Sequence, residues 1–258
     1  MKRRRLLSGA VCVILAWSLF SCAGTTKEVR IKQGEASRNL GEAYMQEGRY
    51  TAALKELLKA EKQIPNDPYL QNDLGLTYLA KERPEIAIEH FKEAVRLNPD
   101  YAPARNNLGV AYMAAKNWDA AIATFEKVSE DLLYATPHFP LTNMGWAYYN
   151  KGKFKDAVAY FQEALEIEPQ YILALRNLGI TYMSMKKYRD AIDTFERAID
   201  LTPRFPPLYM DLAQAYAALR DNQSALQTYK KVIALFPRSD FAEEAKKKAG
   251  EILLRTSG

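Results

Sequence analysis

Cysteine and histidine are scarce in this sequence, with two of each among 258 residues. Two cysteines are too few for a disulfide-dense scaffold or a multi-cysteine metal site, and His90 and His138 leave little for histidine-rich metal chemistry. Glycine and proline number only 12 each, which excludes collagen-like and low-complexity classes. The 48% hydrophobic and 26% charged residues are ordinary for a folded globular protein.

The excess of positive charge is also small. The formal net charge is +5, and the four basic residues 2–5 supply +4 of it, so the rest of the chain carries about +1. The basic isoelectric point therefore gives no support for a nucleic-acid partner. The sequence contains no glycine-rich phosphate loop, no metal-spaced His/Cys cluster and no supported Ser-His-Asp arrangement. We expect no enzyme activity, no cofactor and no metal, and structural or exposed roles for both histidines.

The segment 1–22 has the layout of a secretory signal. A basic stretch ends at Arg5, and the apolar run Leu6–Phe20 follows it. The run is shorter than the roughly 20 residues that a membrane-spanning helix needs. An uncleaved anchor with an incidental cysteine remains the alternative interpretation.

The end of this run, Leu19-Phe20-Ser21-Cys22, resembles the lipobox of bacterial lipoproteins, in which a small residue precedes a cysteine that receives lipid. The resemblance implies a signal peptide over 1–21, lipid on Cys22 and removal of Cys12 with the signal. Ala23 stands where an aspartate favours inner-membrane retention in the enteric sorting rule. The resemblance therefore implies a lipid anchor on the periplasmic face of the outer membrane. Residues 22–33 show no apolar period and are interpreted as a lipidated tether.

A repeated pattern fills the rest of the chain. A large residue followed by glycine or alanine recurs every 34 residues, except that the step between the third and fourth units is 36 residues. The small residues of this pattern are Gly41, Gly75, Gly109, Gly145, Gly179 and Ala213. In every unit a tyrosine follows three positions later, an alanine twelve positions later and a large residue four beyond that alanine. Proline closes five of the six units, where it ends the second helix.

This pattern resembles the tetratricopeptide repeat across residues 34–237. Its chemistry is packing: the small residues let two antiparallel helices, A and B, approach closely, and the large residues fill the space between them. The resemblance implies an all-α, right-handed superhelical solenoid of six repeats, each with helices of about 13 residues. Residues 238–258 supply a C-terminal capping helix and tail, with Ser239 or Asp240 as N-cap. One face of that helix carries Ala242, Ala245, Ala249 and Ile252.

Helix A of each repeat lines the concave side of such a solenoid. Counting each repeat from residues 34, 68, 102, 138, 172 and 206, position six is always an amide or a carboxylate. These residues are Asn39, Asp73, Asn107, Asn143, Asn177 and Asp211. The ladder can bond the backbone of a bound peptide or bridge neighbouring repeats, and the sequence favours neither.

Positions two, nine and twelve of the central repeats are apolar, aromatic and methionine-rich, a surface that suits an apolar helix or strand of a partner. The alternative is that part of this stripe packs against adjacent helices. Basic residues are sparse on this face, where only Arg38 and Arg176 occur, so a clamp for terminal carboxylates is disfavoured. The predicted groove residues are Tyr69, Asp73, Leu76, Leu79, Asn107, Val110, Met113, Phe139, Asn143, Trp146, Tyr149, Leu173, Asn177, Ile180 and Met183.

The connection after the third repeat is longer than the others and contains Ser129, Asp131, Leu133 and Tyr134. A lipidated six-repeat array with such a connection resembles the type IV pilus biogenesis/stability lipoproteins, which include pilotins that escort the outer-membrane secretin subunit. The resemblance implies a scaffold that binds the secretin subunit, or another pilus-assembly protein, and assists outer-membrane localisation and assembly of the secretin. The alternative is a general periplasmic scaffold that recruits cell-wall hydrolases or envelope-assembly factors. The oligomeric state stays open.

Overall fold

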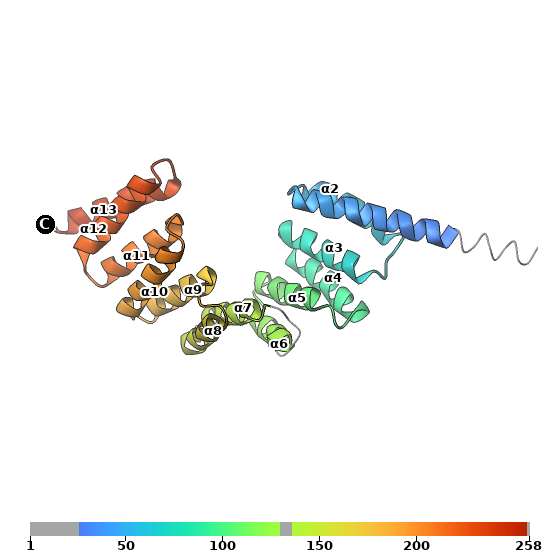
Figure 1. The fold of residues 1–258 in the computed structure, drawn as a ribbon, viewed down its shortest axis with the longest axis horizontal. Coiled ribbons are helices and arrows are strands. Elements are labelled where there is room, and N and C mark those ends of the chain that lie inside the picture. The colour runs from blue at the N-terminus through green and yellow to red at the C-terminus, as the bar shows by residue number, and fades with distance from the viewer. Residues whose placement is uncertain (1–25, 130–135, 257–258) are drawn as a thin grey trace, which may run out of the picture. The chain divides into compact units, whose positions relative to one another are not determined.

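The computed structural model describes residues 26–129 and 136–256, and every regular element in these two ranges is a helix (Figure 1). The predicted signal peptide and the lipidation site Cys22 lie outside the described residues, as do Asp131, Leu133 and Tyr134 of the long connection.

None of the helices in the described ranges combines the length and the apolar character that crossing a membrane requires.

The helices follow one another as the A and B helices of six repeats, and a final helix comes after them. The first pair is a helix over 26–46 and α2 (Tyr50–Glu61). The later pairs are α3 (Pro68–Ala80) and α4 (Pro84–Leu97), α5 (Ala102–Ala114) and α6 (Trp118–Ser129), α7 (His138–Asn150) and α8 (Phe154–Ile167), α9 (Ile172–Ser184) and α10 (Tyr188–Leu201), and α11 (Pro206–Ala218) and α12 (Asn222–Leu235). The final helix is α13 (Asp240–Thr256).

The chain divides into two compact units, Met1–Ala115 and Lys116–Gly258. In the first unit α2, α3, α4 and α5 pack in chain order, and the A helices α3 and α5 also contact each other. In the second unit each helix from α6 to α13 packs against the next one. There α9 contacts both α7 and α11, and α11 contacts α13. Successive A helices therefore lie side by side within each unit, as the predicted solenoid requires.

The glycines of the repeat pattern lie where helix A crosses the large residue of helix B. A Cβ atom at Gly75 would lie 2.6 Å from Cε1 of Phe91, and one at Gly145 would lie 2.7 Å from Cε1 of Phe161. Both phenylalanine side chains are completely buried. Since such short carbon–carbon distances are sterically forbidden, glycine is needed for the two helices to approach this closely.

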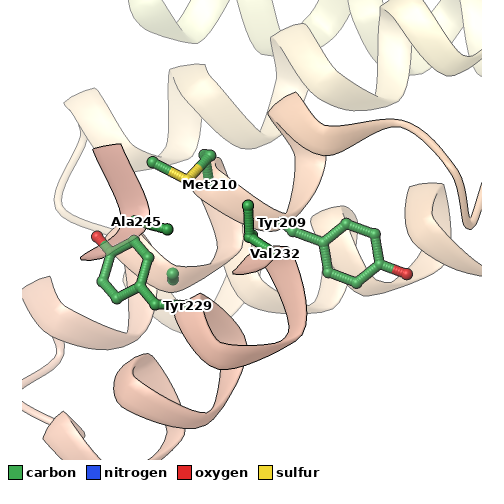
Figure 2. Close-up of a cluster of buried hydrophobic side chains, with 6 residues drawn as sticks. Tyr209, Met210, Tyr229, Val232 and Ala245 are labelled. Atoms are coloured by element: carbon green, nitrogen blue, oxygen red, sulfur yellow. The ribbon is translucent and has the colours of Figure 1, made fainter. Parts of the chain in front are cut away.

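The final helix covers the sixth repeat. Figure 2 shows the ring of Tyr229 beside Ala245 in a cluster that also contains Met210 and Val232. The predicted apolar face is confirmed, because Ala242 and Ala245 are fully buried and Ala249 and Ile252 pack against this cluster. The hydroxyl of Ser239 accepts a hydrogen bond of 3.2 Å from the backbone N–H of Ala242, so serine is the residue that caps the helix.

The start of the first helix differs from the sequence prediction. Residues 26–33, interpreted as tether, are helical and continue into helix A of the first repeat. Gly34 is buried, and a Cβ atom there would lie 2.9 Å from the side chain of Ile64. Ile31, one turn earlier, is half-buried. This helix is therefore stabilised by contacts with the chain after α2, which the local apolar pattern of 22–33 does not reveal.

Candidate functional site

The structure separates the predicted groove residues by their exposure. The position-two side chains are the most open: Tyr69 is 48% exposed, Phe139 38% and Leu173 46%. Positions nine and twelve are half-buried, namely Leu76, Leu79, Val110, Met113, Trp146, Tyr149, Ile180 and Met183. Among the predicted groove residues, those at position two are therefore the most open to a partner.

Part of the predicted stripe belongs to the core of the repeats. Leu76 and Leu79 pack against a buried cluster that contains Ile88 and Phe91. Met45, which occupies position twelve of the first repeat, packs against the cluster around Leu57. The alternative interpretation, packing against adjacent helices, therefore holds for these three side chains.

Two position-six side chains bridge neighbouring repeats. Asn107 Nδ2 donates a 2.9 Å hydrogen bond to Asn72 Oδ1 of the preceding repeat. Arg176 Nε donates a 2.6 Å bond to Asp211 Oδ2, again across one repeat. Asn177 is only 8% exposed. At Asn107 and Asp211 the position-six side chains therefore form hydrogen bonds between neighbouring repeats. Asn143 and Asp73 are half-buried.

Two aromatic residues that the sequence prediction missed extend the position-two surface. Tyr101 and Tyr171 are the N-cap residues of α5 and α9. The ring centroid of Tyr101 lies 5.0 Å from that of Tyr69, and the centroid of Tyr171 lies 5.4 Å from that of Phe139, both edge to face. The sequence does contain a pattern that indicates this position, because an aromatic residue stands just before both the fifth and the sixth repeat, at Tyr171 and Phe205.

Both histidines take part in packed contacts. The ring of His138 lies 4.9 Å from that of Tyr171, beside Phe139. His90 Nδ1 lies 2.7 Å from Oε1 of Gln71, and its ring stacks on Tyr78. Burial lowers the pKa of His90 below its usual range.

The first unit concentrates carboxylates around one arginine. Arg38 Nη1 donates to Asp67 Oδ2 at 3.0 Å, and its guanidinium carbon lies 5.7 Å from the ring centroid of Tyr69. Burial raises the pKa of Asp73 to about 7, the charge of Glu42 contributes to this rise, and Arg38 opposes both effects. Burial and the charge of Asp73 also raise the pKa of the nearby Tyr101 hydroxyl.

The second unit carries an aromatic pair on α7. The rings of Trp146 and Tyr149 stack with centroids 4.8 Å apart. The Tyr149 hydroxyl lies 3.1 Å from Ser184 Oγ on α9, and its ring centroid lies 5.5 Å from that of Phe154 on α8. Tyr149 therefore ties three helices together as well as supporting Trp146.

In residues 26–129 and 136–256 no three His, Cys, Asp or Glu side chains gather as a metal site would require. Of the residues singled out in the long connection, Ser129 is described, and its hydroxyl donates a 2.9 Å hydrogen bond to the carbonyl of Glu126 at the end of α6.

Sequence models of the tetratricopeptide repeat match residues 41–82, 72–131, 140–171 and 176–240, which together make up most of the chain. The chain belongs to the tetratricopeptide repeat family. Proteins of this family are scaffolds for protein–protein interaction, and the described residues of this tetratricopeptide repeat protein contain no feature that indicates catalysis. No curated protein matches the sequence.

Several solved structures share the fold. PilW, a widely conserved type IV pilus biogenesis factor, is 24% identical with a TM-score of 0.75, over 82% of this chain and 97% of PilW. Pseudomonas aeruginosa pilF is 19% identical with a TM-score of 0.68, over 85% of this chain and 99% of pilF. A tetratricopeptide repeat protein from Parabacteroides merdae is 17% identical with a TM-score of 0.70, over 88% of each chain. At these identities the likeness concerns the fold.

Proposed function

We propose that this protein is a non-enzymatic outer-membrane lipoprotein that binds the type IV pilus secretin subunit and assists its localisation and assembly. The observation that carries the proposal is the correspondence of whole chains: the array matches 97% of the PilW chain and 99% of the pilF chain. The lipobox-like sequence ending at Cys22 supports the same assignment, because a lipid would hold the array at a bilayer.

The geometry suits a docking scaffold. The cores of the repeats are filled by side chains from the same chain, so a partner does not need to complete the fold. Tyr69, Phe139 and Leu173 stay exposed on A helices that pack against neighbouring helices. Aromatic side chains such as Tyr69 and Phe139 contribute large contact areas to protein interfaces and lose little conformational entropy on binding.

The test is a deletion strain in the native host. We expect monomeric or mislocalised secretin on immunoblots of separated membranes, together with few surface pili. The wild-type gene should restore secretin multimers, whereas a Tyr69→Ala/Phe139→Ser/Leu173→Ser variant should not. These three residues are exposed, so circular dichroism of the variant should be unchanged. Normal secretin rings in the deletion strain would overturn the proposal.

The lipid anchor has its own test. Metabolic labelling with an alkyne fatty acid should mark the wild-type protein in the outer-membrane fraction, and Cys22→Ala should abolish the label. Labelling that survives this substitution would contradict the assignment of Cys22.

A general envelope scaffold is the second candidate, because a tetratricopeptide repeat protein from Parabacteroides merdae shares the fold with a TM-score of 0.70, between the values for PilW and pilF. Affinity capture from native envelopes separates the two. Secretin and pilus-alignment proteins in the eluate support the leading proposal, and cell-wall hydrolases without pilus proteins support the general scaffold.

A further inference from the structure

A hollow of about 450 Å³ lies in the first unit between the helix over 26–46 and the chain that leads from α2 into α3. Its lining is mostly apolar and comes from Ile31, Ile64, Pro65, Pro68 and Tyr69. Volumes of this size accommodate one or two side chains of a bound segment. The hollow therefore offers an apolar subsite for a side chain of a partner.

The hollow is continuous with the aromatic and acidic surface described above. Asp67 and Tyr69 line it, and both also contact Arg38. The ring of Tyr69 meets that of Tyr101 edge to face at 5.0 Å. A partner segment that enters the hollow would therefore also meet Tyr69 and Tyr101, and the charge of Asp73 acts on the Tyr101 hydroxyl.

The charges of this surface do not balance. Four carboxylates, Glu35, Glu42, Asp67 and Asp73, face two guanidinium groups, Arg30 and Arg38. Arg38 is committed to Asp67, whose Oδ1 also accepts hydrogen bonds from the backbone N–H groups of Tyr69 and Leu70. Neither Glu42 nor Asp73 makes an ion pair with any described residue. The surface therefore carries an excess of negative charge, and burial, together with the charge of Glu42, raises the pKa of Asp73.

We propose that this surface binds a partner segment in which an apolar side chain stands next to a lysine or arginine. The apolar side chain fills the hollow beside Ile64 and Tyr69, and the cationic group lies between Glu42 and Asp73, next to the tyrosine rings. This inference rests on the proposed function, since it names the chemistry of the segment that the scaffold binds.

Charge complementarity favours such a segment over purely apolar and acidic ones. A purely apolar segment would cover Glu42 without supplying a cation, and a desolvated, unpaired carboxylate is costly. An acidic segment would be repelled by the excess negative charge. A cation satisfies both carboxylates and gains from the electron-rich faces of neighbouring aromatic rings.

The test uses the mature chain with Cys22→Ala and fluorescence anisotropy. The probe is a fluorescent nonapeptide in which two lysines alternate with three leucines, and its counterparts carry glutamine or glutamate in place of lysine. We expect the lysine peptide to bind about tenfold more tightly than the glutamine peptide, and the glutamate peptide to bind least. Added salt should reduce the preference for lysine.

Substitutions then locate the preference. Glu42→Gln/Asp73→Asn should remove the advantage of the lysine peptide over the glutamine peptide, whereas Glu85→Gln, a charge-removing change on an exposed residue of α4, should leave it intact. Circular dichroism checks that both variants keep the helical array. Equal binding of the lysine and glutamine peptides by the wild type, or an unchanged preference in the double variant, would overturn this inference.

The peptide experiment and the deletion strain fail independently. If the lysine preference is present but secretin rings form normally without the protein, the ligand chemistry stands and the secretin assignment falls. If rings depend on the protein but the peptides are not distinguished, the secretin assignment stands and this ligand chemistry is wrong.

Discussion

The indole of Trp146 stacks on the phenol ring of Tyr149, with ring centroids 4.8 Å apart and planes 9° from parallel. The two residues are three apart on α7, so helical geometry brings their side chains together. Tyr149 is held by Ser184 and Phe154 on the neighbouring helices, whereas the only ring contact of Trp146 among the described residues is Tyr149. The pair therefore combines a structural tyrosine with a tryptophan that it positions for contact with a partner.

This division predicts different effects for the two residues. Trp146→Ser should weaken binding of the captured partner by about tenfold and change the free energy of unfolding by less than about 1 kcal/mol. Tyr149→Ser should lower that free energy by about 2 kcal/mol because contacts with two neighbouring helices are lost. Urea denaturation and pull-down of both variants check this. Equal destabilisation by both substitutions would show that Trp146 is also a core residue.

Gly145→Leu should lower the free energy of unfolding by more than about 2 kcal/mol, because a side chain at this position would collide with Phe161. Gly250 on α13 provides the matched control, since a Cβ atom there meets nothing within 4 Å. Gly250→Ala should instead stabilise the protein by about 0.5–1 kcal/mol through helix propensity. Thermal and urea unfolding of both variants measures the contrast.

Asp73→Asn should stabilise the fold, and more so at high pH. The folded-state pKa of Asp73 is raised from 3.8 to about 7, so between these values the unfolded state releases a proton that the folded state retains. The contribution of Asp73 to the free energy of unfolding is therefore most favourable below about pH 4, and it decreases as the pH rises towards 7. We expect the variant to gain about 1–3 kcal/mol at pH 8 and less at pH 5. A gain that is equal at both pH values would contradict this account.

His90 should make the protein sensitive to acid. Its pKa is lowered from 6.5 by burial, so below pH 6.5 the unfolded state binds a proton that the folded state excludes. Stability is lost as the pH falls from 6.5 towards the lowered pKa. His90→Gln keeps a donor for Gln71 and should flatten the dependence of unfolding free energy on pH between 7 and 5. An unchanged slope would show that His90 does not contribute to it.

The order of helices was predictable because the same contacts between helices A and B recur in each repeat. The spacing from Gly75 to Phe91 and from Gly145 to Phe161 already indicates which residues cross between helices A and B. Such contacts join residues close in sequence, so a repeated pattern reports them directly. The helix over 26–33 was not predicted from the sequence. It continues into the helix that packs against Ile64, which lies after α2, and the local pattern of 26–33 does not reveal that contact.

The sequence by itself determined the family, the six helix pairs and the apolar face of α13, since these depend on periodic spacing. Only the tertiary structure decided which of the predicted groove residues are open to a partner. Leu76 and Leu79 share helical spacing with Tyr69 but turn into a cluster with Phe91, and Asn107 is taken up by Asn72 of the preceding repeat. A helical period assigns a residue to a face, whereas burial and pairing depend on the neighbouring repeat that covers that face.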